Sequence, residues 1–277
     1  MKIQFTFIFC LAVYLVAGQI PYGDNPAAGK YLKVDDAKIY YESYGTGQPI
    51  VLLHGGLFGD ISEYGKLIPK LSEHHQVIAI DLRGHGKSEI GDRPFTYEIL
   101  SKDVYEILKS ITAEKAVVIG FSDGAITALK FAVSYPNAIK KLVCLGGPLL
   151  SPMDYKAGMV DNLKTWTGDF FEKQMPDFVK ARKALMPQPE RWNDFVEKLK
   201  NAWIQPVYIE KSEIQKLKSP ILMICGDRDQ YVTLENYVSV YRSLTNAQLS
   251  VVPDSDHVVL FTQPDIVEKN IMAFLTN

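Results

Sequence analysis

Residues 116–129 read AVVIGFSDGAITAL, and this stretch decides the fold. It begins with an apolar run, Ala116–Ile119, that is typical of a buried strand, and it continues from Ala125 with a helical pattern. Residues 120–124 between them read Gly-x-Ser-x-Gly, which in a strand–turn–helix context indicates a nucleophile elbow. Such a turn strains the serine backbone and lifts its hydroxyl above the sheet, while bulk at either glycine would collide with a neighbouring element. We therefore predict that Ser122 is a nucleophile.

A serine hydroxyl is a weak nucleophile until a base activates it. Among the five histidines only His257 follows Ser122, directly after the last apolar run. The chain order for this type of elbow is serine, then acid, then histidine. His257 is therefore the candidate base.

The acid should follow a strand that lies between the serine and the histidine. Ile221–Cys225 is such a run, and residues 226–229 after it read Gly-Asp-Arg-Asp. We favour Asp229, because the Gly-x-x-Asp spacing gives its side chain enough loop to reach inward. Asp227 is expected to cap the turn or to pair with Arg228. The acid would hold the imidazole tautomer and stabilise the imidazolium.

Acyl transfer also needs donors for the developing oxyanion. Residues 54–59 read HGGLFG after an apolar run, and glycines there leave backbone N–H groups accessible. We predict that the oxyanion hole consists of the N–H groups of Gly56 and Asp123. His54 and His85 precede the serine and are expected to be structural.

Short apolar runs alternate with helical periodicity along the chain, which suits strands that are buried on both faces of a parallel sheet. The runs are Ile50–Leu53, Val77–Ile80, Ala116–Ile119, Lys141–Leu145, Ile221–Cys225 and Gln248–Val252. Helical patterns cover Leu100–Ile111, Ala125–Tyr135 and Ile266–Leu275, and a hairpin is predicted for Tyr31–Val34 and Ala37–Tyr44. This alternation predicts the fold class α/β, with a mostly parallel central sheet flanked by helices.

One stretch, residues 149–218, contains no convincing strand and interrupts the alternation. Its aromatic residues stand amid charged, helical-looking sequence: Trp166, Phe170, Phe171, Trp192, Phe195 and Trp203. Pro189 suits the first turn of a new helix. We predict a helical cap over residues 149–218, inserted between core segments 30–148 and 219–277. Most of its aromatic residues should form a small core, and a few could line a pocket.

The composition excludes some classes of protein. The chain has 277 residues with 30 Lys+Arg and 32 Asp+Glu, a formal net charge of −2. A nucleic-acid binder or a polybasic membrane-surface protein usually carries a basic excess. Cys144 and Cys225 lie in apolar runs, so we expect buried free thiols. A disulfide between them is possible in an oxidising compartment, but strand-interior geometry rarely suits one.

The N-terminus has the outline of a secretory signal over residues 1–18, with Val16 and Gly18 at the −3 and −1 positions. An uncleaved anchor is the alternative, but the apolar run is short for a span of about 20 residues. Cys10 stands in mid-run, which disfavours a lipid anchor. Residues 19–29 read as a linker or arm. The sequence thus predicts an exported protein, periplasmic or secreted, without stable membrane anchoring after cleavage.

Metal-ligand spacing, a phosphate loop and a suitably placed Gly-x-Gly-x-x-Gly are not found in the sequence. We therefore expect no cofactor and no metal. The expected partner is a small-molecule ester substrate, and the oligomeric state is left open.

Four motifs in this order resemble the α/β-hydrolase superfamily, in particular its serine hydrolases of the AB hydrolase-1 type. They are HGGLFG (54–59), DLRGHGKS (81–88), GFSDG (120–124) and GDRD (226–229), followed by the late His257. The resemblance implies that residues 81–88 shape the turn after a core strand and that the helical insertion is the family's cap. Residues 122–129 are similar to valacyclovir-hydrolase-type members, which hydrolyse amino-acid esters and carry Asp after the nucleophile. Ser122 argues against the dehalogenases and epoxide hydrolases of this superfamily, which use Asp.

Three functional hypotheses follow. The first is a serine hydrolase that cleaves small carboxylic esters or lactones through an acyl-enzyme, with Leu57, Phe58, Phe121, Trp166 and Val258 as candidate substrate-binding residues. The second is an aminopeptidase or aminoacyl-ester hydrolase in which the Asp123 carboxylate pairs with a substrate ammonium; the alternative is that Asp123 only bonds locally. The third is a non-catalytic binding protein, or a cofactor-free haloperoxidase, on the same fold.

Overall fold

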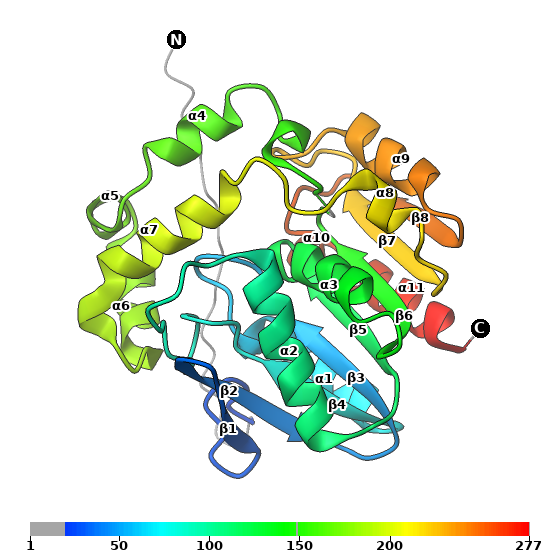
Figure 1. Ribbon diagram of the computed structural model, residues 1–277, viewed down its shortest axis with the longest axis horizontal. Helices are drawn as coiled ribbons and strands as arrows, with labels where there is room; N and C mark the ends of the chain where they lie inside the picture. Colours follow the sequence, from blue (N-terminus) through cyan, green and yellow to red (C-terminus); the bar gives the residue numbers. More distant parts are fainter. Residues whose placement is uncertain (1–19, 148, 277) are drawn as a thin grey trace.

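An eight-stranded sheet forms the centre of the protein, in the order β1-β2-β4-β3-β5-β6-β7-β8 (Figure 1). The strands are β1 Gly29–Val34, β2 Ala37–Tyr44, β3 Gln48–Leu53, β4 His75–Ile80, β5 Ala116–Phe121, β6 Ile139–Leu145, β7 Ile221–Gly226 and β8 Ala247–Val252. β2 pairs antiparallel with β1 and β4, and all other pairs are parallel. The predicted α/β class, the mostly parallel sheet and the N-terminal hairpin are confirmed.

The computed structural model describes residues 20–147 and 149–276, so the predicted signal peptide lies outside the described residues. The helices are η1 Ile61–Tyr64, α1 Leu67–Ser72, α2 Tyr97–Ile111, α3 Asp123–Ser134, η2 Pro152–Asp154, α4 Met159–Lys164, α5 Gly168–Gln174, α6 Pro176–Leu185, η3 Pro189–Arg191, α7 Trp192–Trp203, α8 Lys211–Ile214, α9 Leu234–Ser243, α10 Val259–Thr262 and α11 Pro264–Thr276. None of these helices of the described chain combines the length and the apolar character needed to cross a membrane.

Two cores, one on each face of the sheet, explain why the strands read as unbroken apolar runs. Successive strand residues point to opposite faces. Val51 belongs to the core covered by α2, α3 and α9, whereas its neighbour Leu52 belongs to the core under α1, α10 and α11. Figure 1 shows α2 and α3 in front of the sheet and α11 behind it. Both faces of the central strands are therefore dry: every residue of β5 and β7 is buried, whereas the edge strands β1 and β8 keep exposed residues.

Residues 149–218 contain helices and no strand in the part that the structure describes. Helices α4 to α7 stand together to the left of the sheet in Figure 1. They enclose a core of their own, in which Phe171, Trp192 and Phe195 are at most 3% exposed. Pro189 opens η3 directly before α7, so the break predicted at this proline is real.

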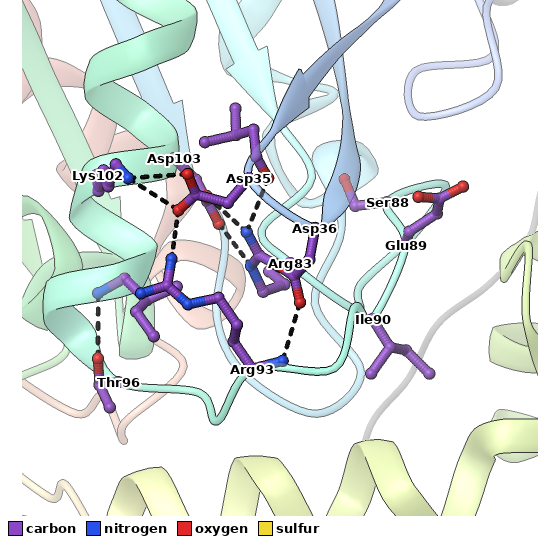
Figure 2. A network of polar contacts seen from close by, with 12 residues as sticks. Asp35, Asp36, Arg83, Ser88, Glu89, Ile90, Arg93, Thr96, Lys102 and Asp103 are labelled. Atoms are coloured by element: carbon purple, nitrogen blue, oxygen red, sulfur yellow. Dashed lines mark hydrogen bonds and ion pairs between the residues drawn. The ribbon is translucent and has the colours of Figure 1, made fainter.

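Arg83, in the turn after β4, is fully buried and ties three elements together (Figure 2). Its Nε and Nη2 donate to the two carboxylate oxygens of Asp103 on α2, at 2.8 and 2.9 Å. Its Nη1 donates at 2.7 Å to Asp36 in the β1–β2 turn, and Asp36 in turn accepts the N–H groups of Asp92 and Arg93. Such bidentate ion pairs fix geometry strongly. Arg83 therefore fixes α2 and the β1–β2 turn relative to the end of β4.

The segment before β1 is a docked arm, not a linker. Glu42 on β2 is completely buried, and its carboxylate accepts the N–H groups of Gly23 and Asn25 at 2.9 and 2.8 Å. The hydroxyls of Tyr40 and Tyr44 donate to the same carboxylate. A buried charge needs such partners, so the arm belongs to the core. Of the two interpretations of residues 19–29, a linker or an arm, the contacts of Gly23 and Asn25 favour the arm for residues 20–28, and Gly29 begins β1.

The two described cysteines, Cys144 on β6 and Cys225 on β7, are buried and free, as expected. Burial raises the pKa of each thiol to about 12. They behave as small apolar side chains of the core.

Candidate active site

The turn between β5 and α3 has the geometry of the expected elbow. Ser122 has φ +51° and ψ −117°, a strained conformation for a residue other than glycine. A Cβ on Gly120 would lie 2.1 Å from the Gly124 carbonyl oxygen, and a Cβ on Gly124 would lie 2.0 Å from that of Leu53. Both glycines are thus required because strand β5, helix α3 and strand β3 approach so closely.

Three side chains from distant stretches meet beside this turn. Ser122 Oγ lies 2.9 Å from His257 Nε2, and His257 Nδ1 lies 2.9 Å from Asp229 Oδ2. Ser122 follows β5, Asp229 follows β7, and His257 follows β8, so each side chain comes from the carboxyl end of a parallel strand. Parallel strands bring these ends to one edge of the sheet. The structure thus brings the predicted nucleophile, acid and base together.

Asp229 and Asp227 have different surroundings. Asp229 is 3% exposed, and its Oδ1 accepts the N–H groups of Tyr231 and Val232 at 2.8 and 3.0 Å. Asp227 instead accepts the N–H of Ser255 at 3.2 Å and stands away from the histidine. Arg228 pairs with Asp254, so the suggested Asp227–Arg228 pair is wrong. The reason is that the loop after β8 brings a closer carboxylate to Arg228, which leaves Asp227 to cap the turn.

The acid and the base stabilise each other's charged forms. Burial opposes the charge on His257 and lowers its pKa, but the charge and hydrogen bond of Asp229 outweigh burial and hold the pKa above its usual 6.5. Burial likewise raises the pKa of Asp229, yet His257, Tyr237 and the loop N–H groups bring it down to about 2. Asp229 is therefore ionised across the working pH range, and His257 can gain a proton readily.

The loop after β3 carries Gly56, one of the two predicted oxyanion donors. Leu57 in this loop has φ +57°, a left-handed conformation that turns the chain sharply after Gly56. Among residues 20–147 and 149–276, no protein acceptor pairs with the N–H of Gly56 or of Asp123. Both residues line the same cavity as Ser122, which agrees with their predicted role as oxyanion donors.

Glu63 on η1 is a site residue that the sequence analysis missed. Its carboxylate accepts the Gly55 N–H at 2.8 Å and so anchors the loop that carries Gly56. Burial raises the pKa of Glu63 to about 8, against the opposing effect of the Gly55 hydrogen bond. A glutamate eight residues from the glycine it anchors gives no recognisable sequence signal.

The carboxylate of Asp123 does not bond locally. Trp203 Nε1, at the end of helix α7, donates to Oδ1 and Oδ2 at 2.9 and 2.7 Å, and Tyr97 Oη donates to Oδ1 at 2.9 Å. The alternative of purely local bonding is therefore wrong. Burial raises the pKa of Asp123, while these two donors act in the opposite direction. The sequence gives no signal for either partner of Asp123, because Trp203 and Tyr97 are both far from it along the chain.

A cavity of about 1540 Å³ opens above Ser122 and His257. Its wall includes all five residues proposed for substrate binding: Leu57, Phe58, Phe121, Trp166 and Val258. Apolar side chains of the segment that holds α4 to α7 form much of the remaining wall, among them Met159, Leu163, Phe171 and Met175. The arm reaches the cavity through Ile20, Pro21 and Tyr22. Two aromatic residues of the helical segment thus combine the two predicted roles, because Trp166 and Phe171 belong to its hydrophobic core and also line the cavity.

His54 and His85 lie outside this chemistry. His54 is fully buried and accepts the Leu82 N–H through Nε2 at 2.9 Å. His85 is also buried, with Nδ1 3.1 Å from the Arg83 carbonyl oxygen. Their structural placement agrees with what their position before the serine suggested.

A mostly parallel sheet with helices on both faces, a strained serine turn and a histidine–carboxylate pair beside it define the class of α/β enzymes built on a nucleophile elbow. A family model described as "alpha/beta hydrolase fold" matches residues 48–206, more than half of the chain. The chain belongs to the α/β-hydrolase fold family.

Named relatives point the same way. The human protein "Serine hydrolase BPHL" is 24% identical over 245 residues, which cover 85% of this chain and 82% of the relative. A 2-hydroxy-6-oxo-6-(2'-aminophenyl)hexa-2,4-dienoic acid hydrolase of Metapseudomonas resinovorans is 23% identical over 265 residues, 89% of this chain and 90% of the relative. The solved esterase of Exiguobacterium antarcticum superposes with a TM-score of 0.72 at 21% identity, covering 90% of this chain and all of the esterase. The names support a hydrolase, and the esterase structure shows the shared fold.

Proposed function

We propose that this protein is a serine hydrolase that cleaves carboxylic esters, lactones included, through Ser122, His257 and Asp229. The observation that carries the proposal is the continuous chain of two 2.9 Å contacts from Ser122 Oγ through the imidazole to Asp229, at the floor of a large cavity. The contact distance is within hydrogen-bond reach for a nucleophile and its general base.

Acylation begins when Ser122 Oγ attacks the ester carbonyl carbon and its proton passes to His257 Nε2. The carbonyl oxygen becomes an oxyanion, which accepts the N–H groups of Gly56 and Asp123. The imidazolium is stabilised by Asp229, which keeps its negative charge throughout. His257 then gives its proton to the leaving alkoxide oxygen, and an acyl group remains on Ser122. In a lactone the alcohol stays attached to that acyl group.

Deacylation repeats these steps with water as the nucleophile. Water loses a proton to His257 Nε2 as its oxygen attacks the acyl carbon, and the same two N–H groups bind the second oxyanion. Collapse returns the proton to Ser122 Oγ and releases the carboxylic acid. Every proton that leaves Ser122 or water thus passes through one nitrogen of one histidine.

The size of the cavity indicates how large an acyl group the enzyme accepts. Pockets for drug-sized ligands usually measure roughly 300–1,000 Å³, so about 1540 Å³ leaves room for substrates well beyond an acetate. We therefore expect the enzyme to accept longer or bulkier esters as well as small ones.

The first experiment compares Ser122→Ala with the wild type on p-nitrophenyl acetate and butyrate. Loss of the nucleophile should lower kcat by about 10⁴-fold or more. Ser134→Ala, at the exposed end of the same helix, is the matched control and should keep wild-type rates. A fluorophosphonate probe should label the wild type at Ser122. Full activity in Ser122→Ala, or no labelling of folded wild type, would contradict the proposal; the latter result favours a binding protein.

A second candidate is an aminoacyl-ester hydrolase or aminopeptidase. The Asp123 carboxylate lines the cavity next to the nucleophile, and its two hydrogen-bond donors, Trp203 and Tyr97, are neutral groups. A substrate ammonium would supply the positive charge that these donors lack. The chemistry at Ser122 would be the same, and only the recognition of the acyl group would differ.

The two candidates differ in their response at residue 123. Glycyl and acetyl esters of one alcohol are compared in the wild type and in Asp123→Asn, which keeps the backbone N–H. Ammonium recognition predicts that the preference for the glycyl ester drops by about tenfold or more in the variant. An unchanged preference would remove this second candidate.

A further inference from the structure

Asp229 Oδ2 accepts two hydrogen bonds, and only one of them comes from the histidine. His257 Nδ1 lies 2.9 Å from this oxygen, and Tyr237 Oη lies 2.5 Å from it. The other carboxylate oxygen accepts two backbone N–H groups of the same loop. The Asp229 carboxylate thus accepts four hydrogen bonds. Among the other three donors, only the Tyr237 hydroxyl bonds the same oxygen, Oδ2, as His257 does.

Tyr237 is held in that position by its helix. Thr233 caps the N-terminus of α9, so the helix begins directly after the loop that carries Asp229. The Tyr237 side chain is 1% exposed and packs in the core on one face of the sheet. Among the residues described, the Asp229 carboxylate is the only hydrogen-bond partner of its hydroxyl. Burial and then the charge of Asp229 raise the pKa of Tyr237 well above 10, so the phenol remains a donor throughout the working pH range.

We propose that Tyr237 is a positioning residue that acts on His257 through Asp229. Its hydroxyl fixes the direction of Oδ2 and withdraws negative charge from that oxygen, which limits how strongly the acid stabilises the imidazolium. No proton leaves the phenol. The inference rests on the proposed role of His257 as general base.

The sign of the effect follows from this arrangement. Removal of the hydroxyl concentrates negative charge on the oxygen that faces Nδ1, so the imidazolium becomes more stable and the pKa of His257 rises. A base with a higher pKa is protonated, and inactive, up to a higher pH. The acidic limb of kcat/KM against pH should therefore move upward.

Other charged neighbours do not change in this experiment. Besides Asp229, Asp123 on α3 and Asp256 in its own loop also act on His257, and Lys156, before α4, donates to the Asp229 carbonyl oxygen. Cys225 on β7 faces Tyr237. The Tyr231 ring packs edge-on at 4.8 Å from the imidazole. All of these groups are present in wild type and variant alike, so a shift reports the hydroxyl.

Tyr237→Phe keeps the buried ring and removes only the hydroxyl. On p-nitrophenyl butyrate we expect kcat to fall about 10- to 100-fold and the acidic limb to rise by about 0.5 pH unit or more. Tyr241→Phe is the matched control: it lies one turn further along α9, and its ring is likewise packed, half-buried, against the same core. Its profile should overlay the wild type. A Tyr237→Phe profile that falls uniformly without moving along the pH axis would overturn the proposal and leave a packing role.

A second substitution works in the opposite direction and preserves the hydrogen bond. Tyr237→3-fluorotyrosine has nearly the same size and a more acidic phenol, so it donates more strongly and should move the limb to lower pH. An upward or absent shift would overturn the proposal even if Tyr237→Phe does not fold.

The inference can also be judged without turnover. In Ser122→Ala, which removes the nucleophile, NMR titration of His257 reads the pKa directly, with Tyr or 3-fluorotyrosine at position 237. A lower His257 pKa with fluorotyrosine supports the inference, and an unchanged or higher value overturns it. Failure of ester hydrolysis in the wild type would instead refute the proposed function, so the two failures are distinguishable.

Discussion

Two aspartates of one loop, Asp227 and Asp229, show how strongly residue chemistry depends on the immediate surroundings. Asp229 is buried against four donors and is held ionised, with its pKa lowered to about 2. Asp227 bonds one backbone N–H of the neighbouring loop. The same side chain thus serves as a charge partner at one position and as a turn cap at the other, because only Asp229 faces the imidazole.

The pair also provides a matched test of the acid. Asp229→Asn should lower kcat by about 10⁴-fold, because an amide favours the wrong imidazole tautomer and cannot stabilise the imidazolium. Asp227→Asn should stay close to wild type. Steady-state rates on p-nitrophenyl butyrate measure both, and equal losses in the two variants would argue against the assignment.

The pH profile of the wild type tests the base. Since the pKa of His257 is raised above 6.5, kcat/KM should fall about tenfold per pH unit below that pKa, as the imidazole becomes protonated and can no longer accept the Ser122 proton. An acidic limb centred below pH 6 would be inconsistent with the Asp229 contact.

At the scale of elements, the N-terminal arm behaves as part of the core because a buried charge holds it. Four donors converge on the Glu42 carboxylate, two from the arm backbone and two from tyrosine hydroxyls. The arm then reaches the cavity wall through Tyr22. A segment rich in proline and glycine thus becomes ordered because it satisfies an ionised group that would otherwise be costly to bury.

Glu42→Gln should therefore reduce stability although it preserves shape. The amide has one acceptor oxygen for four donors, and its NH₂ group would face donors instead of acceptors. We expect the free energy of unfolding to drop by about 2 kcal/mol or more in urea titrations. Glu73→Gln, at an exposed position where only the backbone N–H is hydrogen-bonded, is the control and should leave the midpoint unchanged. Equal midpoints for both variants would show that the arm contributes nothing.

At the scale of the whole molecule, helices α4 to α7 are joined to the rest of the protein by buried polar contacts as well as by apolar packing. Trp203 on α7 bonds Asp123, and Arg182 on α6 donates to Asp60 at 3.1 Å and to the Phe58 carbonyl. Arg182 is only 4% exposed. The first contact ends on Asp123 and the second on the loop that carries Gly56, so the positions of α6 and α7 are coupled to both predicted oxyanion donors.

Arg182→Met tests this coupling. Removal of one partner leaves the largely buried Asp60 without its cation, which should cost about 3 kcal/mol of stability. Asp60→Asn combined with Arg182→Met should cost less than the sum of the single changes, with a coupling energy of at least about 1 kcal/mol in unfolding experiments. Additive losses would mean that the two side chains do not stabilise each other.

Local sequence patterns predict part of the candidate site. The strained turn at Ser122 follows from two glycines that no larger residue could replace, and its strand and helix follow from the period of their apolar residues. His257 could be selected because no other histidine follows the serine. The fold class and the candidate triad were therefore predictable from patterns that act over a few residues.

The partners of these residues were not predictable in the same way. Trp203 on Asp123, Tyr237 on Asp229, Glu63 on Gly55 and Glu42 on the arm each join positions that ordinary local periodicity leaves unrelated. By itself the sequence determined the sheet, the elbow and the order of nucleophile, acid and base, because backbone sterics and hydrophobic periodicity are local. Only the tertiary structure decided which buried donors meet which carboxylates, because that pairing depends on how whole elements pack against one another.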